Sequence, residues 1–535
     1  MTDLSPSLSR AARLVAAAGV VALTALGGCT SSSGKEGHDS ATTLRVLAGS
    51  EVKDMLPLLA DAENATGVHV ELSYTGSIQG TELVASGDAA GKYDAIWFPN
   101  NRYLSLLPGA DQQIGESVKI MSSPVVLGLA PDVAARLGWD TQAPTWAQIA
   151  DAAAAGEFTY GMTNPAASNS GFGALVSVAT ALSGTGSALT VDDIDRVVPG
   201  LQKFASAQNL TAGSSGWLAD KYAADPQLVN GIVNYESVLL SLKAAGTPLT
   251  IVTPSDGVLT SDYPLTLLSG ADATHQQLFD TLTTWLTTPD VQQRIASQVH
   301  RRPGVAGVDT GDQFGDAVLF ETPFPNTLDV ANTLITTYLE AVRRPSQEVF
   351  VLDTSGSMEG ERIGALRQAL KNLAGADTST LGEFSKFRGG ERVTLLPFSD
   401  QPGDQTVFDI PDNQGFDYGQ ITVYADRLQA GGSTAIYDTL EEAYRTAVQQ
   451  RGERPDTYVS VVLMTDGENT AGQSFDDFRA AWPGLDAAGI PTFVVLFGDA
   501  NVEEMTQVAE LTGGQTFDAL GGDLAQAFQD IRGYQ

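Results

Sequence analysis

The sequence predicts an α/β protein, because short apolar runs typical of strands alternate with helical segments along most of the chain. Many of these runs end in turns rich in Ser, Thr, Gly, Asn or Asp. In parallel sheets such turns lie at the carboxyl ends of the strands, where ligands bind. We therefore expect binding sites at strand ends in two regions, one before residue 325 and one after residue 346.

Composition narrows the functions that the chain can have. Its 535 residues include 30 Lys and Arg against 64 Asp and Glu, which gives a net charge of −34. Because so negative a chain repels phosphate backbones, we expect no nucleic-acid binding. Cys29 is the single cysteine, which excludes a disulfide within the chain and every multi-cysteine metal site. A hydrophobic fraction of 43% suffices for buried cores.

The start of the chain has the pattern of a secretory signal. Arg10 and Arg13 precede an apolar run over residues 14–26. The run is shorter than the ~20 residues of an ordinary transmembrane helix. We expect a signal peptide at residues 1–28, followed at 29–41 by a flexible tether.

The segment Leu26-Gly27-Gly28-Cys29 resembles a bacterial lipobox. The resemblance implies cleavage before Cys29 and acylation of its thiol by fatty acids such as palmitate. The mature protein would then be extracytoplasmic and lipid-anchored to the cell membrane. The alternative is a plain signal peptide in which the cysteine is accidental. Because the sole cysteine coincides with the cleavage position, the sequence favours lipidation.

Residues 42–325 form the first predicted module. Three apolar runs between residues 44 and 98, separated by helical patterns, indicate a parallel sheet. The pattern restarts with a crossover strand at 124–130. Polar turns follow the strands, and helix N-termini that begin at such turns favour negatively charged or polar ligands.

This region resembles the extracellular solute-binding proteins of ABC importers, of the branch that binds oxyanions, iron or small polar solutes. Three segments carry the resemblance: 75–77, 164–171 and 234–236. It implies two lobes joined by a hinge, with a ligand cleft between them. Ordinary turn chemistry is the alternative for these residues, and the scarcity of Arg and Lys at the turns disfavours a strongly anionic solute. The candidate ligand-binding residues are Ser50, Thr75, Ser77, Asn100, Asn164, Ser168, Ser170 and Tyr235.

A connector is predicted at residues 326–345. Apolar residues recur near helical spacing from residue 327 to residue 343. Arg343 and Arg344 suit the end of a helix, and Pro345 stops it.

Residues 346–535 predict a doubly wound sheet, because near-continuous apolar strands alternate with helices. Three strand-end loops carry oxygen ligands. The spacing of Asp353, Ser355 and Ser357 lets one carboxylate and two hydroxyls converge, while Thr434 and Asp466 arrive from separate loops. Ligands that are all oxygen select a hard cation, Mg²⁺ first and Ca²⁺ or Mn²⁺ next.

These five residues resemble the metal-ion-dependent adhesion site of von Willebrand factor type A domains. The resemblance implies that the three ligands of the first loop and Thr434 bind the metal directly or through water. It also implies that Asp466 binds through water and that the final helix can move with ligation. The alternative is a strand-to-helix turn whose hydroxyls only cap a helix, which three compatible loops in the right order disfavour.

Three functions fit these modules. The first is a surface-anchored protein whose metal binds an Asp or Glu of a protein partner, with the solute-binding-like module as a second recognition unit. The second is the substrate-binding lipoprotein of an ABC importer, with the type A domain as a docking domain. The third is an extracytoplasmic assembly factor. We expect no enzyme activity, because the sequence lacks both a phosphate-binding loop motif and a Gly-x-Ser-x-Gly nucleophile motif in this region.

Overall fold

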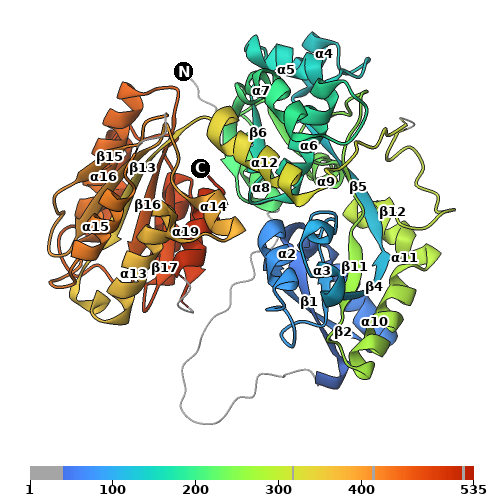
Figure 1. Cartoon of the computed structure of the whole chain (residues 1–535), viewed down its shortest axis with the longest axis horizontal. Coiled ribbons are helices and arrows are strands. Elements are labelled where there is room, and N and C mark those ends of the chain that lie inside the picture. The colour runs from blue at the N-terminus through green and yellow to red at the C-terminus, as the bar shows by residue number, and fades with distance from the viewer. Residues whose placement is uncertain (1–39, 316–317, 413–415, 521–523) are drawn as a thin grey trace, which may run out of the picture. The chain divides into compact units, whose positions relative to one another are not determined.

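The computed structural model describes residues 40–315, 318–412, 416–520 and 524–535. The part from Ser40 to Gln535 is one compact unit that contains three sheets with helices packed on them (Figure 1). The α/β class predicted from the sequence is confirmed. The predicted signal peptide and Cys29 lie outside the described residues. Within the described ranges, no helix is both long and apolar enough to cross a membrane.

The first lobe is built on a five-stranded sheet with the order β2-β1-β3-β11-β4. β1 pairs in parallel with β2 and β3, as the sequence predicts, but β11 pairs antiparallel with β3 and with β4. The parallel pairing predicted for the three runs between residues 44 and 98 is therefore confirmed, and β11, which returns to this sheet from the second lobe, adds the antiparallel pairs. The strands are β1 (Thr43–Gly49), β2 (His69–Thr75), β3 (Ala95–Trp97), β4 (Ile114–Lys119) and β11 (Pro264–Leu268). The helices are α1 (Leu56–Thr66), α2 (Ser77–Ala85), α3 (Ala110–Gln113), α10 (Ala273–Leu286) and α11 (Pro289–Arg294).

The second lobe is built on a seven-stranded sheet in which β10, β5, β8, β6 and β7 lie in order, and β9 and β12 also pair with β5. β5 is buried along its whole length, including the two serines, Ser122 and Ser123, that precede its apolar part. The strands are β5 (Met121–Leu129), β6 (Tyr160–Thr163), β7 (Gln208–Ala212), β8 (Gly231–Tyr235), β9 (Thr250–Val252), β10 (Thr260–Ser261) and β12 (Arg302–Pro303). The helices are α4 (Pro131–Leu137), α5 (Trp146–Ala154), α6 (Asn169–Ser183), α7 (Val191–Ala205), α8 (Ser215–Ala224) and α9 (Glu236–Ala244).

The connector is the helix α12 (Leu328–Thr337), which continues as a π-helical turn over Tyr338–Val342. Tyr338 donates a hydrogen bond to Gln208 Oε1 of the second lobe over 3.0 Å. On its other side, Arg343 pairs with Glu391 of the C-terminal domain. The connector is therefore bound both to the second lobe and to the C-terminal domain.

The C-terminal domain has a six-stranded sheet with the order β15-β14-β13-β16-β17-β18. Its pairs are parallel except that of β14 with β15. The strands are β13 (Ser346–Asp353), β14 (Arg392–Phe398), β15 (Thr406–Asp409), β16 (Tyr458–Thr465), β17 (Thr492–Phe497) and β18 (Gln515–Ala519). The helices are α13 (Glu361–Lys371), α14 (Thr380–Ser385), α15 (Gly419–Arg427), α16 (Ile436–Glu453), α17 (Phe475–Ala481), α18 (Val502–Thr512) and α19 (Leu524–Arg532).

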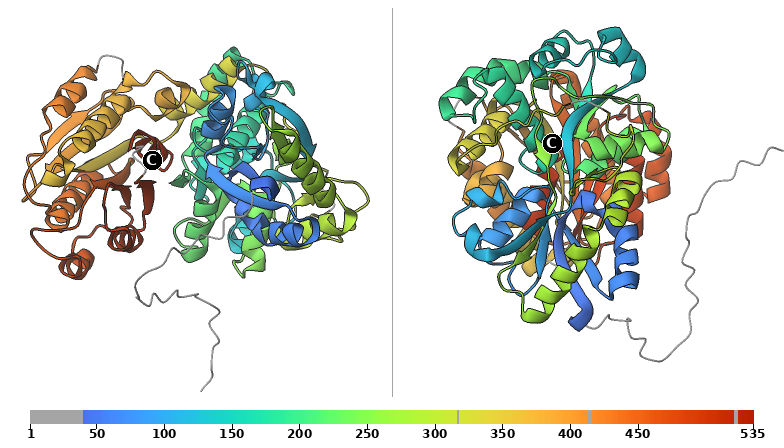
Figure 2. Two further views of the ribbon diagram at one scale, coloured as in Figure 1. Left: turned by 90° about the horizontal axis from the view of Figure 1, so that it is seen from below. Right: turned by 90° about the vertical axis from the view of Figure 1, so that its right-hand side faces the viewer.

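Helices cover both faces of this third sheet (Figure 2). Phe350 and Leu352 of β13 belong to the core under α13, α15 and α19. Val349 and Val351, which alternate with them, belong to the core under α16, α17 and α18. The sheet is thus doubly wound, as its near-continuous apolar strands predict.

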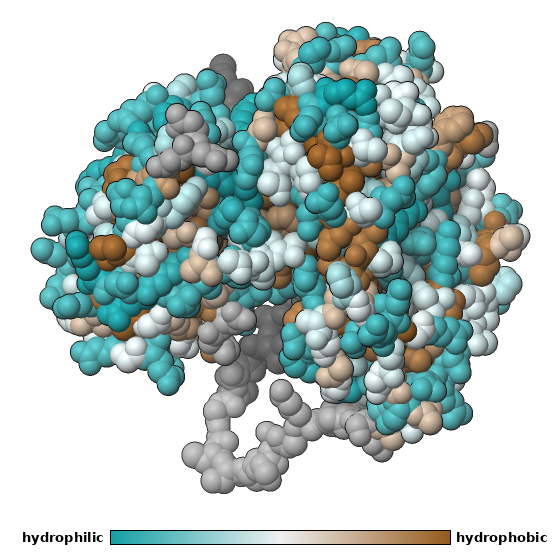
Figure 3. All heavy atoms as spheres, viewed as in Figure 1, coloured by the Kyte–Doolittle hydropathy of each residue, from teal (hydrophilic) through white to brown (hydrophobic). Residues whose placement is uncertain are grey.

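The surface agrees with the acidic composition. On the face drawn in Figure 3, hydrophilic residues predominate and the hydrophobic ones form small groups among them. Such a surface is expected to keep a chain of net charge −34 solvated.

Candidate functional site

The five predicted metal ligands lie at the carboxyl edge of the third sheet. β13 ends at Asp353, and a 3₁₀ turn over Gly356–Met358 leads from it toward α13. β16 ends one residue before Asp466. These two neighbouring strands therefore bring both carboxylates to one place, and both side chains are fully buried.

A chain of contacts joins four of the five residues. Asp353 Oδ1 accepts a hydrogen bond from the Ser355 backbone N–H over 2.8 Å. The Ser355 and Ser357 hydroxyl oxygens are 2.9 Å apart. Ser357 Oγ in turn donates to Asp466 Oδ1 over 2.7 Å. The other oxygen of Asp353, Oδ2, accepts from Thr465 Oγ1 over 2.7 Å.

Thr434 approaches from the loop that precedes α16. A methyl group built on Gly467 would lie 3.6 Å from Ser357 Oγ and 4.0 Å from Thr434 Oγ1, so both hydroxyls face the same small space. The loop is fixed to the first one by two backbone hydrogen bonds, from Gly431 N to Thr354 O and from Gly356 N to Gly432 O. The structure thus brings all three predicted loops together.

The electrostatics of this site leave negative charge incompletely balanced. Burial raises the pKa of the Asp353 carboxyl above its ordinary value, with a further contribution from the nearby charge of Asp466. Arg362 supplies positive charge, because its Nη1 lies 2.6 Å from Asp466 Oδ2 and its Nη2 lies 2.8 Å from Asp499 Oδ2. Asp353 itself makes its hydrogen bonds with a backbone N–H and a hydroxyl.

These residues fit a hard divalent cation. Two carboxylates, two serine hydroxyls and one threonine hydroxyl form a set of oxygen donors, and Mg²⁺, Ca²⁺ and Mn²⁺ prefer oxygen. Among the described residues no group of three or more His, Cys, Asp or Glu side chains is arranged for a metal. The candidate site has only two carboxylates beside its three hydroxyls, so it is not a group of that kind.

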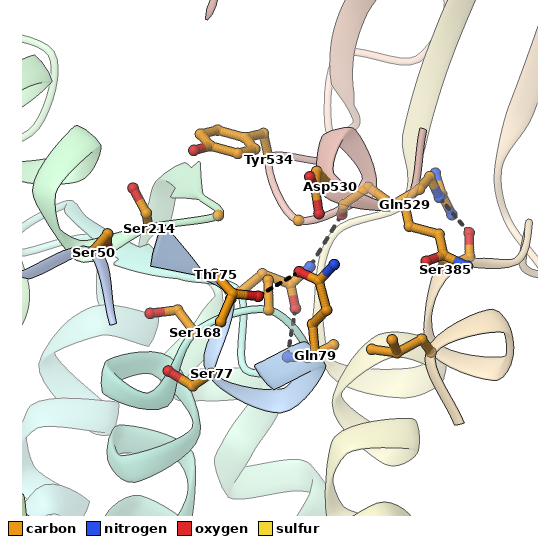
Figure 4. A pocket seen from close by; sticks show the side chains of 18 of the residues that line it. Ser50, Thr75, Ser77, Gln79, Ser168, Ser214, Ser385, Gln529, Asp530 and Tyr534 are labelled. Atoms are coloured by element: carbon orange, nitrogen blue, oxygen red, sulfur yellow. Dashed lines mark hydrogen bonds between the residues drawn. The ribbon is translucent and has the colours of Figure 1, made fainter. Parts of the chain in front are cut away.

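The predicted solute cleft contains a pocket of about 480 Å³. Five of the eight candidate residues line it, namely Ser50, Thr75, Ser77, Asn164 and Ser168. They come from the carboxyl ends of β1 and β2 in the first lobe and of β6 in the second. Figure 4 shows Ser50, Thr75, Ser77 and Ser168 around the pocket.

The other three candidates lie in a buried hydrogen-bond network and do not line this pocket. Asn100 of the first lobe donates to Asn169 Oδ1 of the second over 2.9 Å, and Asn169 Nδ2 donates to the Tyr235 hydroxyl over 3.0 Å. Ser170 Oγ lies 2.7 Å from Ser215 Oγ. The bond between Asn100 and Asn169 joins the two lobes, whereas Tyr235 and Ser170 bond to partners within the second lobe.

Sequence reasoning missed several residues that line the pocket. Glu51 and Gln79 follow predicted turn residues by one and two positions, so a wider window at each strand end would have included them. The opposite wall comes from the C-terminal domain, including Gln529, Asp530 and Tyr534 (Figure 4). No local signal could have found these three, because they belong to a different predicted domain.

The last described residues are docked against the second lobe. Asn164 Nδ2 donates to the backbone oxygen of Arg532 over 3.2 Å. The ring of Tyr534 meets that of Trp217 edge to face at 5.0 Å. A methyl group on Gly213 would lie 2.3 Å from the Tyr534 ring, so the absence of a side chain at residue 213 permits this contact.

Two family models match the chain. Residues 44–298 match the model described as bacterial extracellular solute-binding protein, and residues 349–529 match the von Willebrand factor type A domain. The inter-alpha-trypsin inhibitor heavy chain H4 of Sus scrofa is 31% identical over 134 residues, which are 24% of this chain and 13% of that protein. The chain thus spans about an eighth of the length of this curated relative.

The solved structures to which the chain is similar include two periplasmic proteins. One is the periplasmic binding protein AfuA from Actinobacillus pleuropneumoniae, at 12% identity and a TM-score of 0.43, over 56% of this chain and 98% of that one. The other is described as a periplasmic thiamin binding protein, at 13% identity and a TM-score of 0.45, over 56% and 96%. By these two matches, the chain carries a solute-binding domain at residues 44–298 followed by a von Willebrand factor type A domain at residues 349–529.

Proposed function

We propose that this protein is a lipid-anchored binding protein of the cell surface, whose type A domain binds an acidic side chain of a protein partner through Mg²⁺. The solute-binding domain serves as a second recognition unit. The observation that carries the proposal is the convergence of Asp353, Ser355, Ser357 and Asp466 at one sheet edge, with Thr434 facing the same space.

The neutral hydroxyls explain why the partner should be acidic. Asp353 and Asp466 would bring two negative charges to the ion, and the three hydroxyls would bring none. A Mg²⁺ bound there would act as a Lewis acid that still attracts an anionic oxygen. Asp353 would anchor the ion, while Arg362, which contacts Asp466 Oδ2, would compete with the ion for that carboxylate. A partner carboxylate supplies the missing anionic ligand by replacing water.

Peptide display tests the acidic partner directly. Peptides selected on the purified protein in Mg²⁺ and eluted with EDTA should carry an invariant Asp or Glu. The Asp353→Ala variant should select no such peptides, whereas Asp404→Asn, an exposed aspartate of the same domain, should select them as the wild type does. Selection of the same peptides in EDTA would contradict the proposal.

Membrane anchoring through Cys29 is a separate part of this proposal. The Cys29→Ser variant should be released into the soluble fraction of cells that retain the wild type in their membranes, because serine has no thiol that could carry the lipid. Unchanged fractionation of the variant would contradict lipidation.

An ABC importer subunit is the second candidate function. The pocket at the carboxyl ends of β1, β2 and β6 favours it, because this is the edge at which α/β sheets bind ligands. In that case the type A domain would dock accessory proteins. Uptake assays in cells with and without the protein distinguish this role from adhesion.

A further inference from the structure

The pocket in the cleft has a third wall, which belongs to the type A domain. Gln526, Gln529 and Asp530 of α19 line it, together with the tail residue Tyr534. They face cleft residues that include Thr75, Ser168 and Ser214 (Figure 4). A molecule in this pocket would therefore lie within reach of both domains.

The wall is seated closely against the second lobe. Besides the contact of Tyr534 with Gly213, a methyl group on Gly533 would lie 2.9 Å from Ala167 Cβ. The hydrogen bond from Asn164 to the Arg532 backbone oxygen adds a polar contact at the same place. Asn164 and Ala167 themselves line the pocket, so the docking of the tail shapes the site.

The charged side chains in the pocket wall are Glu51, Asp530 and Arg532. The positive charge of Arg532 is neutralised within the protein, because its guanidinium pairs with Glu348 and Glu391. Its Nε also donates a hydrogen bond to the backbone oxygen of Ser385. Glu51 differs, since its Oε1 is buried and accepts no hydrogen bond from any residue that the structure describes. Arg301 lies behind it, but pairs with Asp54 and donates to the backbone oxygen of Glu51.

Two helix N-termini at the pocket carry partial positive charge, opposite in sign to the acidic side chains. The pocket is lined by Gly76 and Ser77 at the start of α2 and by Ser168 at the start of α6. The N-cap of α2 is Gly76, which has no side chain to cap the helix, and in the described structure the Ser168 side chain makes no capping hydrogen bond to the first turn of α6. Backbone N–H groups at such ends and the helix dipole favour an anionic group.

A solute with a single charge would be attracted either by the acidic side chains of this pocket or by its helix N-termini, and would be repelled by the other group. A simple anion would meet the carboxylates of Glu51 and Asp530, and a simple cation would meet the positive ends of α2 and α6. A zwitterion of amino-acid type carries a carboxylate for the helix ends and an ammonium group for the acidic side chains. Its size also suits a cavity of about 480 Å³.

We infer that this pocket binds a small zwitterionic solute and that α19 of the type A domain forms part of the binding site. This inference rests on the solute-binding role proposed for the N-terminal domain and does not depend on the metal site. Both domains would then contact the same ligand.

The first experiment is a thermal-shift screen of the purified protein against the twenty amino acids and glycine betaine. Calorimetry then compares the best ligand with its two single-charge analogues, one without the amine and one without the carboxylate. We expect the zwitterion to bind at least tenfold more tightly than either analogue. Absence of binding by every zwitterion at millimolar concentration, or equal affinity for an analogue, would overturn the inference.

Variants test the two sides of the site. Glu51→Gln should weaken binding of the zwitterion at least tenfold and strengthen binding of the amine-free analogue, because the like charge that opposes the anion is removed. If α19 is part of the site, Asp530→Asn should weaken binding of the zwitterion severalfold. The control Asp404→Asn should leave the affinity for the zwitterion unchanged. Equal affinity of wild type and Asp530→Asn would exclude the contribution of the type A domain. Asp353→Ala, which removes a predicted metal ligand, should bind the solute as the wild type does. Loss of solute binding can therefore be distinguished from loss of metal binding.

Discussion

Ser357 Oγ donates a hydrogen bond to Asp466 Oδ1 over 2.7 Å, although 109 positions separate the two residues in the chain. The contact joins the first and third loops of the candidate metal site. It also orients a carboxylate that is fully buried. Hydrogen bonds and close contacts within the protein therefore already bring four of the five predicted metal ligands together.

Replacing Ser357 by alanine should affect both stability and metal binding. A single hydrogen bond of this kind contributes about 1 kcal/mol to the free energy of unfolding, and the variant should lose roughly that amount. Mg²⁺ affinity, measured by calorimetry, should fall at least tenfold because a ligand is removed. The exposed Ser187→Ala change is the control and should alter neither quantity. An unchanged Mg²⁺ affinity in Ser357→Ala would exclude this hydroxyl as a ligand.

Arg362 should oppose metal binding. Its guanidinium lies 2.6 Å from Asp466 Oδ2 and thus places a positive charge beside a predicted ligand. In Arg362→Gln the site keeps both carboxylates and loses this competing charge. Mg²⁺ should then bind roughly tenfold more tightly, which corresponds to about 1.4 kcal/mol. Arg445→Gln, which removes an exposed arginine of α16, is the matched control. Weaker binding in Arg362→Gln would mean that Arg362 chiefly positions Asp466.

Arg532 should be critical for the stability of the type A domain. It is buried and pairs with Glu348 of β13 and with Glu391, which is next to β14. Removing one partner from a buried ionic cluster leaves unpaired charge and costs about 3–5 kcal/mol. Arg532→Met should therefore lower the midpoint of urea unfolding sharply, whereas the exposed Arg445→Met should leave it nearly unchanged. Equal midpoints for the two variants would contradict this role.

Stability should fall with rising pH because of Glu51. Burial raises the pKa of its carboxyl from 4.5 to about 7 in the folded protein. The folded state therefore binds more protons than the unfolded state between these two values, so the stabilisation present below pH 4.5 is lost as the pH rises through 7. At about 1.4 kcal/mol for each pKa unit, the loss is at most about 3.5 kcal/mol.

Thermal unfolding from pH 4.5 to pH 8 in the absence of solute measures this effect. Other buried acids, among them Asp54 beside Arg301, also titrate with raised pKa, so the informative quantity is the difference between wild type and Glu51→Gln. The variant should show the flatter profile. Parallel profiles would mean that Glu51 ionises in the folded protein as it does in the unfolded chain.

The type A domain could be predicted closely from sequence because its signals are local. Its near-continuous apolar strands are visible in the sequence, and β16 (Tyr458–Thr465), which is buried in all but its first residue, is one of them. Asp353, Ser355 and Ser357 follow a buried strand directly, so the strand carries them to the sheet edge. Their ordering along the chain and the parallel topology together suffice to bring the loops into one place.

The solute pocket could be predicted only in part, because its walls depend on distant contacts. Ser170 and Tyr235 lie in polar segments like their neighbours, yet pairing with Ser215 and Asn169 draws them into a buried network. Asp530 reaches the pocket only because the C-terminal tail docks on the second lobe. The antiparallel pairing of β11 likewise follows from a chain that returns from the other lobe, which no periodicity reveals.

Calorimetric titration of the metal-free protein with Mg²⁺ tests the central claim most directly. The wild type should bind one Mg²⁺, Asp353→Ala should give no binding heat, and Asp404→Asn should match the wild type. Circular dichroism of the three proteins in EDTA should show the same fold, so that a lost signal reports the site and not unfolding. Equal Mg²⁺ affinity in wild type and Asp353→Ala would contradict the account.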